Sequence, residues 1–232
     1  MKAMAVVKAL TKRIPSKDQW VEEAYGGFGI NPMAEINKIL YCVTPTEEVQ
    51  KKFKSGGYDL LVSHHPFVVK GIPMVILHTA LDCCDGGLND QWADLVKIQD
   101  RKHFDDNLGW YGLVEPISFA DLLKKVDLLS GDIVGQIYHP GNDLIRSVVV
   151  CSGLGGMVLW QARQTGADCY ITGEMTGPAE RSGFRALIEI GHTRSEWMGI
   201  KLIRDVLGPS VLVDYAGFDI DRFGSEVYGG RR

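Results

Sequence analysis

Two adjacent histidines, His64 and His65, close a short apolar run in the stretch DLLVSHHP, which begins at Asp59. The run has the length and composition of a buried strand in a parallel sheet, and Gly57 and Pro66 bound it. Neutral imidazole donates a lone pair near pH 7, so this pair could supply two metal ligands from one rigid support. The alternative is a pair of surface loop histidines, and this stretch alone does not decide between them.

A His-Thr-x-x-acid pattern occurs twice, as HTALD from His78 and as HTRSE from His192. An apolar, strand-like run precedes each histidine. Thr193 and Glu196 also fit a capping box, in which the acid only returns to the start of a helix. The recurrence of both histidine and acid favours a shared site over that alternative. A helix after the second copy is predicted by the spacing of Trp197, Ile200, Ile203 and Leu207.

An internal repeat explains where these residues fall. A shift of 109 positions places INKILYCVTP, from Ile36, on IRSVVVCSGL, from Ile145, and GYDLLVSHH on GADCYITGE. Each copy is typical of strand, turn, amphipathic helix, Gly-x-Asp turn and second strand, which is a right-handed β-α-β unit. The two histidines of the first copy therefore align with Gly173 and Glu174 of the second.

This pattern predicts an α/β fold made of two intertwined β-α-β repeats with mixed sheets and a metal site between the repeats. The repeats cover about residues 36–82 and 145–196, and residues 100–144 connect them within one unit of residues 1–232. The strand-end polar residues are too many for one structural ion. Nitrogen and carboxylate ligands suit zinc, iron or manganese, and a carboxylate can bridge two ions about 3.5 to 4 Å apart. The residues are His64, His65, His78, Asp82, Glu174, His192 and Glu196.

Composition restricts the class of protein. The chain has 232 residues, of which 45% are hydrophobic and 23% charged, as expected for an ordinary soluble globular protein that is long enough for one large or two small domains. A formal charge of -4, without a Lys/Arg cluster, argues against a dedicated nucleic-acid surface. No stretch reaches transmembrane length, and Lys8 interrupts the apolar N-terminal run, so we expect a cytoplasmic protein without membrane contact. Five cysteines without a Cys-x-x-Cys pair indicate reduced thiols and no zinc site of their own.

Four motifs in this order, LLVSHHPF, HTALDCCDGGLND, ADCYITGE and GHTRSE, resemble the dinuclear-metal-centre family. This family is also described as GTP cyclohydrolase I type 2-like or Ngg-interacting-factor-like. The resemblance extends from about residue 36 to residue 215 and implies a ring-shaped homohexamer. It also implies that Glu174 and His78 lie beside the metals as proton-handling groups. The metal ligands that it implies are His64, His65, Asp82, His192 and Glu196.

Three stretches depart from what the resemblance leads us to expect. The usual Trp-Asp-Asn segment near the N-terminus is not recognisable in DQWVEEAYGGFGI. The segment between His65 and His78 is shorter by about one helix, so FVVKGIPMVIL connects them directly. The histidines expected after the Thr-Gly-Glu motif are replaced by MTGPAE. The glycines of CSGLGGMVL, from Cys151, fit a tight turn better than a phosphate-binding loop, because neither a Walker A nor a dinucleotide fingerprint is present.

Two function classes remain open from the sequence. The first is a metal-dependent hydrolase with two divalent ions, acting on a nucleotide or another phosphate-containing small molecule. The second is a non-enzymatic metal-binding protein, either an oligomeric scaffold or a regulatory partner-binding protein. An open coordination position with bound water would favour the first class, and a saturated metal shell would favour the second.

Overall fold

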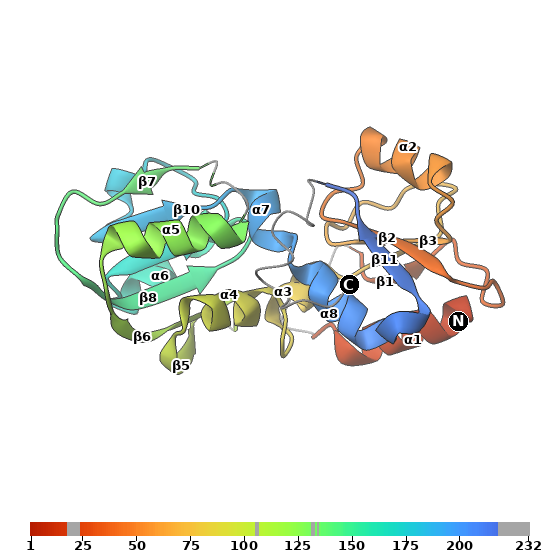
Figure 1. Ribbon diagram of the computed structural model, residues 1–232, viewed down its shortest axis with the longest axis horizontal. Coiled ribbons are helices and arrows are strands. Elements are labelled where there is room, and N and C mark those ends of the chain that lie inside the picture. The colour runs from red at the N-terminus through yellow and green to blue at the C-terminus, as the bar shows by residue number, and fades with distance from the viewer. Residues whose placement is uncertain (18–23, 105–106, 131–132, 134, 218–232) are drawn as a thin grey trace. The chain divides into compact units, whose positions relative to one another are not determined.

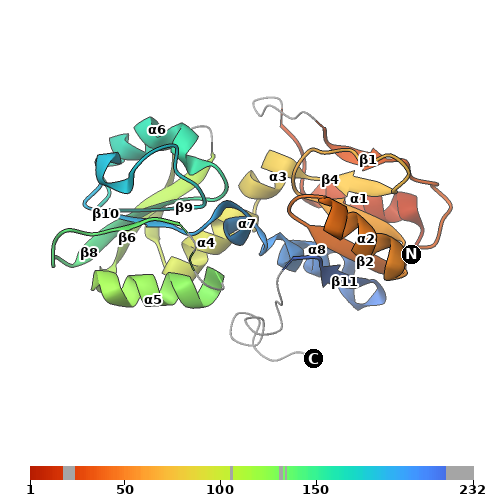
Figure 2. The same cartoon turned by 90° about the horizontal axis from the view of Figure 1, so that it is seen from above.

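The computed structural model describes residues 1–17, 24–104, 107–130, 133 and 135–217. The chain divides into two compact units (Figure 1), one with residues 1–87 and 197–217 and the other with residues 88–196. Each unit contains one mixed β-sheet with helices on both of its faces (Figures 1 and 2). The predicted α/β fold class with mixed sheets is therefore confirmed.

The first unit has a five-stranded sheet in the order β1-β4-β3-β2-β11. All neighbouring strands are parallel except the β1 and β4 pair. Helix α2 lies on one face, and helices α1 and α8 lie on the other (Figure 1). The strands are β1 (Gly26–Phe28), β2 (Lys38–Cys42), β3 (Leu60–Ser63), β4 (Met74–Ile76) and β11 (Leu212–Tyr215). The helices are α1 (Ala3–Arg13), α2 (Glu47–Ser55) and α8 (Gly199–Leu207), with the short α3 (His78–Cys83) after β4.

The apolar run of the first repeat forms β3 as predicted, and all four of its residues are buried. Leu61 packs in one cluster with Val49 and Phe53, which form the buried side of α2. This helix begins where the side chain of Thr46 caps the amide of Val49, with acidic residues in its first turn and basic residues in its last. Burial on both faces of the sheet explains why Leu60, Leu61 and Val62 form a continuous apolar run rather than an alternating pattern.

The second unit has a six-stranded sheet in the order β5-β6-β8-β9-β10-β7. Helix α6 lies on one face, and α4 and α5 lie on the other (Figure 2). Residues 100–144, expected to connect the repeats, contribute most of β5 and all of β6, α5 and β7. The strands are β5 (Gln99–Phe104), β6 (Gly109–Ile117), β7 (Ile137–Tyr138), β8 (Ile145–Cys151), β9 (Cys169–Thr172) and β10 (Ala186–Glu189). The helices are α4 (Leu88–Val96), α5 (Phe119–Ser130), α6 (Leu159–Gln164) and the short α7 (His192–Glu196).

The internal repeat is visible in individual hydrogen bonds. A carboxylate oxygen of Asp59 accepts the amides of Asn37 and Lys38, and one of Asp168 accepts the amides of Arg146 and Ser147. Each bond in one copy has its counterpart 109 positions along the chain. Both Gly-x-Asp turns thus tie the start of one strand to the start of its parallel neighbour.

The repeated order of elements extends beyond the two β-α-β units. The series α1-β1-β2-α2-β3-β4-α3-α4 is followed, after β5 and β6, by the matching series α5-β7-β8-α6-β9-β10-α7-α8. The last helix of each series belongs to the opposite unit: α4 to the second and α8 to the first. The two repeats are intertwined because each contributes its last helix to the unit that contains the other repeat's sheet. Helix α8 confirms the helix predicted after HTRSE, with Ile200, Ile203 and Leu207 buried.

Other expectations concern cysteines, membranes and one loop. All five cysteines are free, as predicted. Among the described residues, no helix is long and apolar enough to cross a membrane. The segment between β3 and β4 contains no helix, which agrees with the direct connection predicted after His65.

Candidate metal centre

The two adjacent histidines follow β3 at its carboxyl end, and the backbone of both is fixed. The amide of His64 donates to the carbonyl of Cys42 at 3.0 Å, and the amide of His65 donates to that of Val43 at 2.8 Å. These bonds continue the ladder between β2 and β3 past the end of the strand. The side chain of His64 is buried, with only 1% exposed. The pair therefore has the rigid support that the sequence predicted.

His65 has a neighbour that sequence reasoning missed. The hydroxyl of Thr44 lies 2.7 Å from Nδ1 of His65. When Nδ1 carries the proton and donates it to this hydroxyl, Nε2 is the unprotonated nitrogen, which is the form that ligates a metal ion. Thr44 follows β2, so its place at the carboxyl edge of a parallel sheet was the available signal.

His78 and Asp82 lie on the same short helix. Helix α3 begins at His78, and a spacing of four residues places both side chains on one face. Nε2 of His64 lies 3.5 Å from Oδ2 of Asp82. The His78 ring centroid is 5.4 Å from that of His64 and 6.0 Å from that of His65. The first unit thus gathers all four of its predicted site residues.

The second unit gathers its three predicted residues around His192. Nε2 of His192 lies 3.2 Å from Oε1 of Glu196, and Nδ1 lies 2.7 Å from Oε2 of Glu174. The hydrogen bond with Glu196, supported by the charge of Glu196 and by Glu174, raises the pKa of His192 to about 9, against the opposing effect of burial. Glu196 is buried, whereas the side chain of Glu174 is 48% exposed.

The capping-box alternative for Glu196 is wrong. Helix α7 begins at His192, so Thr193 lies inside the first turn and not at the capping position. The carboxylate of Glu196 instead faces the imidazole one turn before it. The second His-Thr-x-x-acid motif is therefore a paired histidine and acid at helical spacing.

The glycine-rich loop after β8 adjoins this pair. Gly153 has φ of 62°, and a Cβ there would lie 2.5 Å from Oε1 of Glu196, so a side chain would displace the carboxylate. The buried hydroxyl of Ser195 accepts from the amide of Gly153 and donates to the carbonyl of His192. Sequence reasoning identified the loop as a turn but missed that Gly153 and Ser195 pack against the candidate ligands.

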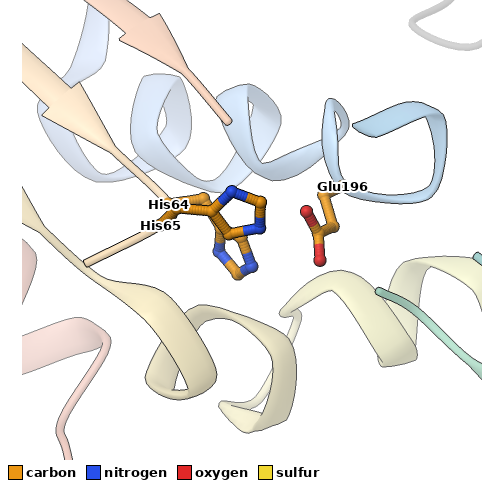
Figure 3. Close-up of side chains that lie close together, drawn as sticks. All are labelled: His64, His65 and Glu196. Atoms are coloured by element: carbon orange, nitrogen blue, oxygen red, sulfur yellow. The ribbon is translucent and has the colours of Figure 1, made fainter. Parts of the chain in front are cut away.

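Three of the five predicted ligands form a group that could hold a metal ion. The ligand atoms offered by His64, His65 and Glu196 all lie within 4.8 Å of one another. Figure 3 shows the carboxylate of Glu196 turned toward the two imidazole rings. Glu196 directly precedes Trp197, which is fully buried in the first unit. Two imidazoles and a carboxylate are a ligand set that zinc, iron and manganese accept.

Comparison with known proteins decides the family. The model of the Duf34/NIF3 (NGG1p interacting factor 3) family matches residues 1–76 and 68–220. The chain belongs to this family. The four motifs thus indicated the NIF3 family correctly.

Relatives in this family share moderate identity. A protein of Methanothermobacter thermautotrophicus named "GTP cyclohydrolase 1 type 2 homolog" is 29% identical over 184 residues, which cover 76% of each chain. A protein of Methanocaldococcus jannaschii with the same name is 26% identical over 247 residues, covering 94% of this chain and 100% of the relative.

Solved structures show the same fold. Reduced HcgD from Methanocaldococcus jannaschii superposes with a TM-score of 0.75 at 24% identity, covering 94% of this chain and 98% of HcgD. The protein ybgI, of unknown function, gives a TM-score of 0.79 at 20% identity, covering 93% of this chain and 97% of ybgI. At these identities the likeness concerns the NIF3 fold and not the activity.

Proposed function

We propose that this protein is a metal-dependent hydrolase with a site for two divalent ions, zinc, iron or manganese. The observation that carries the proposal is the convergence of ligand atoms from His64, His65 and Glu196 within 4.8 Å. Asp82 and His192 complete the proposed set, because each is already paired with a member of that group.

The donor atoms fit metal ligation. Nitrogen and oxygen ligands bind these ions at about 2.0 to 2.2 Å, so two ligands of one ion lie roughly 3 Å or more apart. The separations of 3.5 Å between His64 and Asp82 and of 3.2 Å between His192 and Glu196 agree with that spacing. The two histidine and acid pairs have the same composition, so each repeat supplies both kinds of donor.

Two divalent ions, when bound, lower the pKa of a water molecule toward neutrality and polarise a phosphoryl or carbonyl oxygen. The protein's own contribution is to orient the ligands and to move protons. Glu174 is suited to accept a proton, because its carboxylate is half exposed and is held at Nδ1 of His192. His78 has its ring beside those of His64 and His65 and is a second proton-handling group.

The names of the relatives support a nucleotide as the substrate class, or another small molecule that carries phosphate. Two of them are GTP cyclohydrolase 1 type 2 homologs, so GTP is the first compound to test. Phosphate oxygens are also natural ligands for a pair of divalent ions.

Metal analysis together with turnover tests the proposal. The protein, stripped with a chelator and reloaded with zinc, manganese or iron, should bind up to two ions per chain. His64→Ala and Asp82→Ala should each lower that content. His139→Ala is the matched control, because His139 stacks on Phe119 away from the proposed ligands.

Hydrolysis is measured on GTP and on a panel of nucleotides and phosphate esters. Glu174→Gln should still load with metal at saturating concentrations, with weaker affinity because His192 loses its charged partner, and should lose most of the turnover, because it removes the proton acceptor and leaves the five proposed ligands in place. A protein that binds no ion at all would refute the proposal. A fully loaded protein with no turnover on the panel would favour the metal-binding scaffold instead.

A further inference from the structure

The loop that carries Glu174 is held by two side chains that the proposed mechanism does not use. Glu189 ends β10 and is buried, with 9% of its surface exposed. Its Oε1 accepts the amide of Met175 at 3.0 Å, and its Oε2 accepts the amide of Gln136 at 3.0 Å. Removing a carboxylate from water costs free energy, which the two hydrogen bonds to backbone amides offset. Glu189 is therefore placed to hold these two amides.

Gln136 extends the same network. Its side-chain oxygen accepts the amide of Ala179 at 2.8 Å, and its side-chain nitrogen donates to the carbonyl of Gly177 at 3.1 Å. Its backbone carbonyl accepts the amide of Glu189 at 2.8 Å. Glu189 and Gln136, here called the polar bridge, therefore bind the loop of residues 175–179 at three points.

This loop begins at Glu174, whose own backbone is fixed from the other side. The amide of Glu174 donates to the carbonyl of Gly153, and the carbonyl of Glu174 accepts the amide of Gly156, both at 2.8 Å. With Met175 bound to Glu189, no peptide group next to Glu174 is free to turn. From this fixed backbone, the side chain of Glu174 places its Oε2 2.7 Å from Nδ1 of His192.

Glu189 also lies three residues before His192 in the chain. The end of β10 is therefore connected to both partners of the Glu174 and His192 pair. The chain runs from Glu189 directly to His192, and the carboxylate of Glu189 binds the amide of Met175, the residue after Glu174. A side chain at Gly135 would collide with Glu189, so the approach of residues 135–136 to β10 requires glycine there.

We propose that Glu189, assisted by Gln136, is a positioning residue that keeps Glu174 aligned on His192. The stretch MTGPAE, which replaces the expected histidines, is then the segment that the polar bridge holds. The role of Glu174 in proton transfer rests on the proposed function, but the alignment itself is a property of the metal-free protein as well.

A double-mutant cycle on zinc affinity tests this role. Glu189→Gln removes the charge and one of the two acceptors at nearly constant size, and we expect zinc affinity to fall about tenfold, as for other groups that orient ligands. Glu180→Gln is the control, since Glu180 is an exposed acid in the same segment. In a Glu174→Gln background, Glu189→Gln should change the affinity by less than about twofold, because its effect passes through Glu174. Equal losses in both backgrounds would overturn the proposal.

A second readout does not depend on metal. In the chelated protein, the proton on Nδ1 of His192 should give a nuclear magnetic resonance signal protected from exchange with water. Glu189→Gln should lose this protection, and Gln136→Ala, at an exposed position, should weaken it, because the loop loses two of its hydrogen bonds. Full protection in both variants would refute the positioning role. If the parent binds no zinc, the proposed function fails while this measurement still decides the alignment.

Discussion

Replacing Glu196 by glutamine separates its two roles, as a metal ligand and as the partner of His192. Glutamine keeps the size of the side chain and removes its charge. Glu196 is buried, and its Oε1 lies 3.2 Å from Nε2 of His192, so the change falls in a site with little water to compensate it. We expect losses of both metal affinity and metal-free stability.

The size of the stability loss follows from His192. Raising its pKa from 6.5 to about 9 corresponds to roughly 3 kcal/mol of favourable interaction with the protonated ring. Glu174 provides part of this, and the side chain of His192 is 29% exposed, so water screens the charges. The share of Glu196 is therefore about 1 to 2 kcal/mol.

The dependence on pH has a definite sign. The folded protein binds the His192 proton more tightly than the unfolded chain, so this stabilisation is fully present below about pH 6.5 and is lost as pH rises through about 9. The difference in unfolding free energy between the parent and Glu196→Gln should thus be large at pH 6 and small at pH 10. Urea unfolding of both chelated proteins measures it.

Calorimetric zinc titration of the same variant completes the experiment. Loss of a negative ligand should weaken binding by about tenfold or more. Glu180→Gln again serves as the control, because it removes an exposed acid. Unchanged zinc affinity would exclude Glu196 as a ligand, and a stability loss that does not vary with pH would refute its pairing with protonated His192.

Three further predictions follow from single contacts or from the family. Thr44→Ala should lower zinc affinity about tenfold, because His65 loses the partner of its Nδ1, and Thr44→Ser should restore it; equal affinities would dismiss the contact. Gly153→Ala should destabilise the protein by about 2 kcal/mol in denaturant unfolding, since φ is 62° and the new methyl group meets Glu196; a neutral change would contradict the packing. Light scattering should give a native mass of six chains of 25.6 kDa, and a monomer at micromolar concentration would argue against the proposed hexamer.

Much of the fold could be predicted from local patterns. The apolar run before His64 indicates a buried strand, and the Gly-x-Asp turns indicate where such strands begin, because both patterns depend on only a few neighbouring residues. The shift of 109 positions shows that the same strand pair occurs twice. The structure adds hydrogen bonds that match residue for residue, such as those of Asp59 and Asp168. The exchange of α4 and α8 between units could not be read from the sequence, since it depends on where a helix packs and not on whether it forms.

The three residues of the candidate metal group, His64, His65 and Glu196, were among those predicted from the sequence, but the side chains that support them were not. The sequence shows directly where histidines and acids follow predicted strands. It does not show the hydrogen bonds of Thr44, Ser195 and Glu189, because these join segments that are separated in the chain. The capping pattern at Thr193 suggested a role that the structure does not support. A motif of four residues does not determine where a helix begins, and α7 begins at His192.

The two repeats place different chemistry at equivalent positions. Where the first repeat has His64, the second has Gly173, and a side chain there would collide with Ser195 and with the backbone of Gly153. Where the first has His65, the second has Glu174, which is the most exposed of the three site acids: 48% of its side chain is accessible, against 17% for Asp82 and 3% for Glu196. A proton acceptor must be reached by water, and a ligand carboxylate is better held inside. This difference in exposure supports the proposal that Asp82 and Glu196 are ligands and that Glu174 transfers the proton.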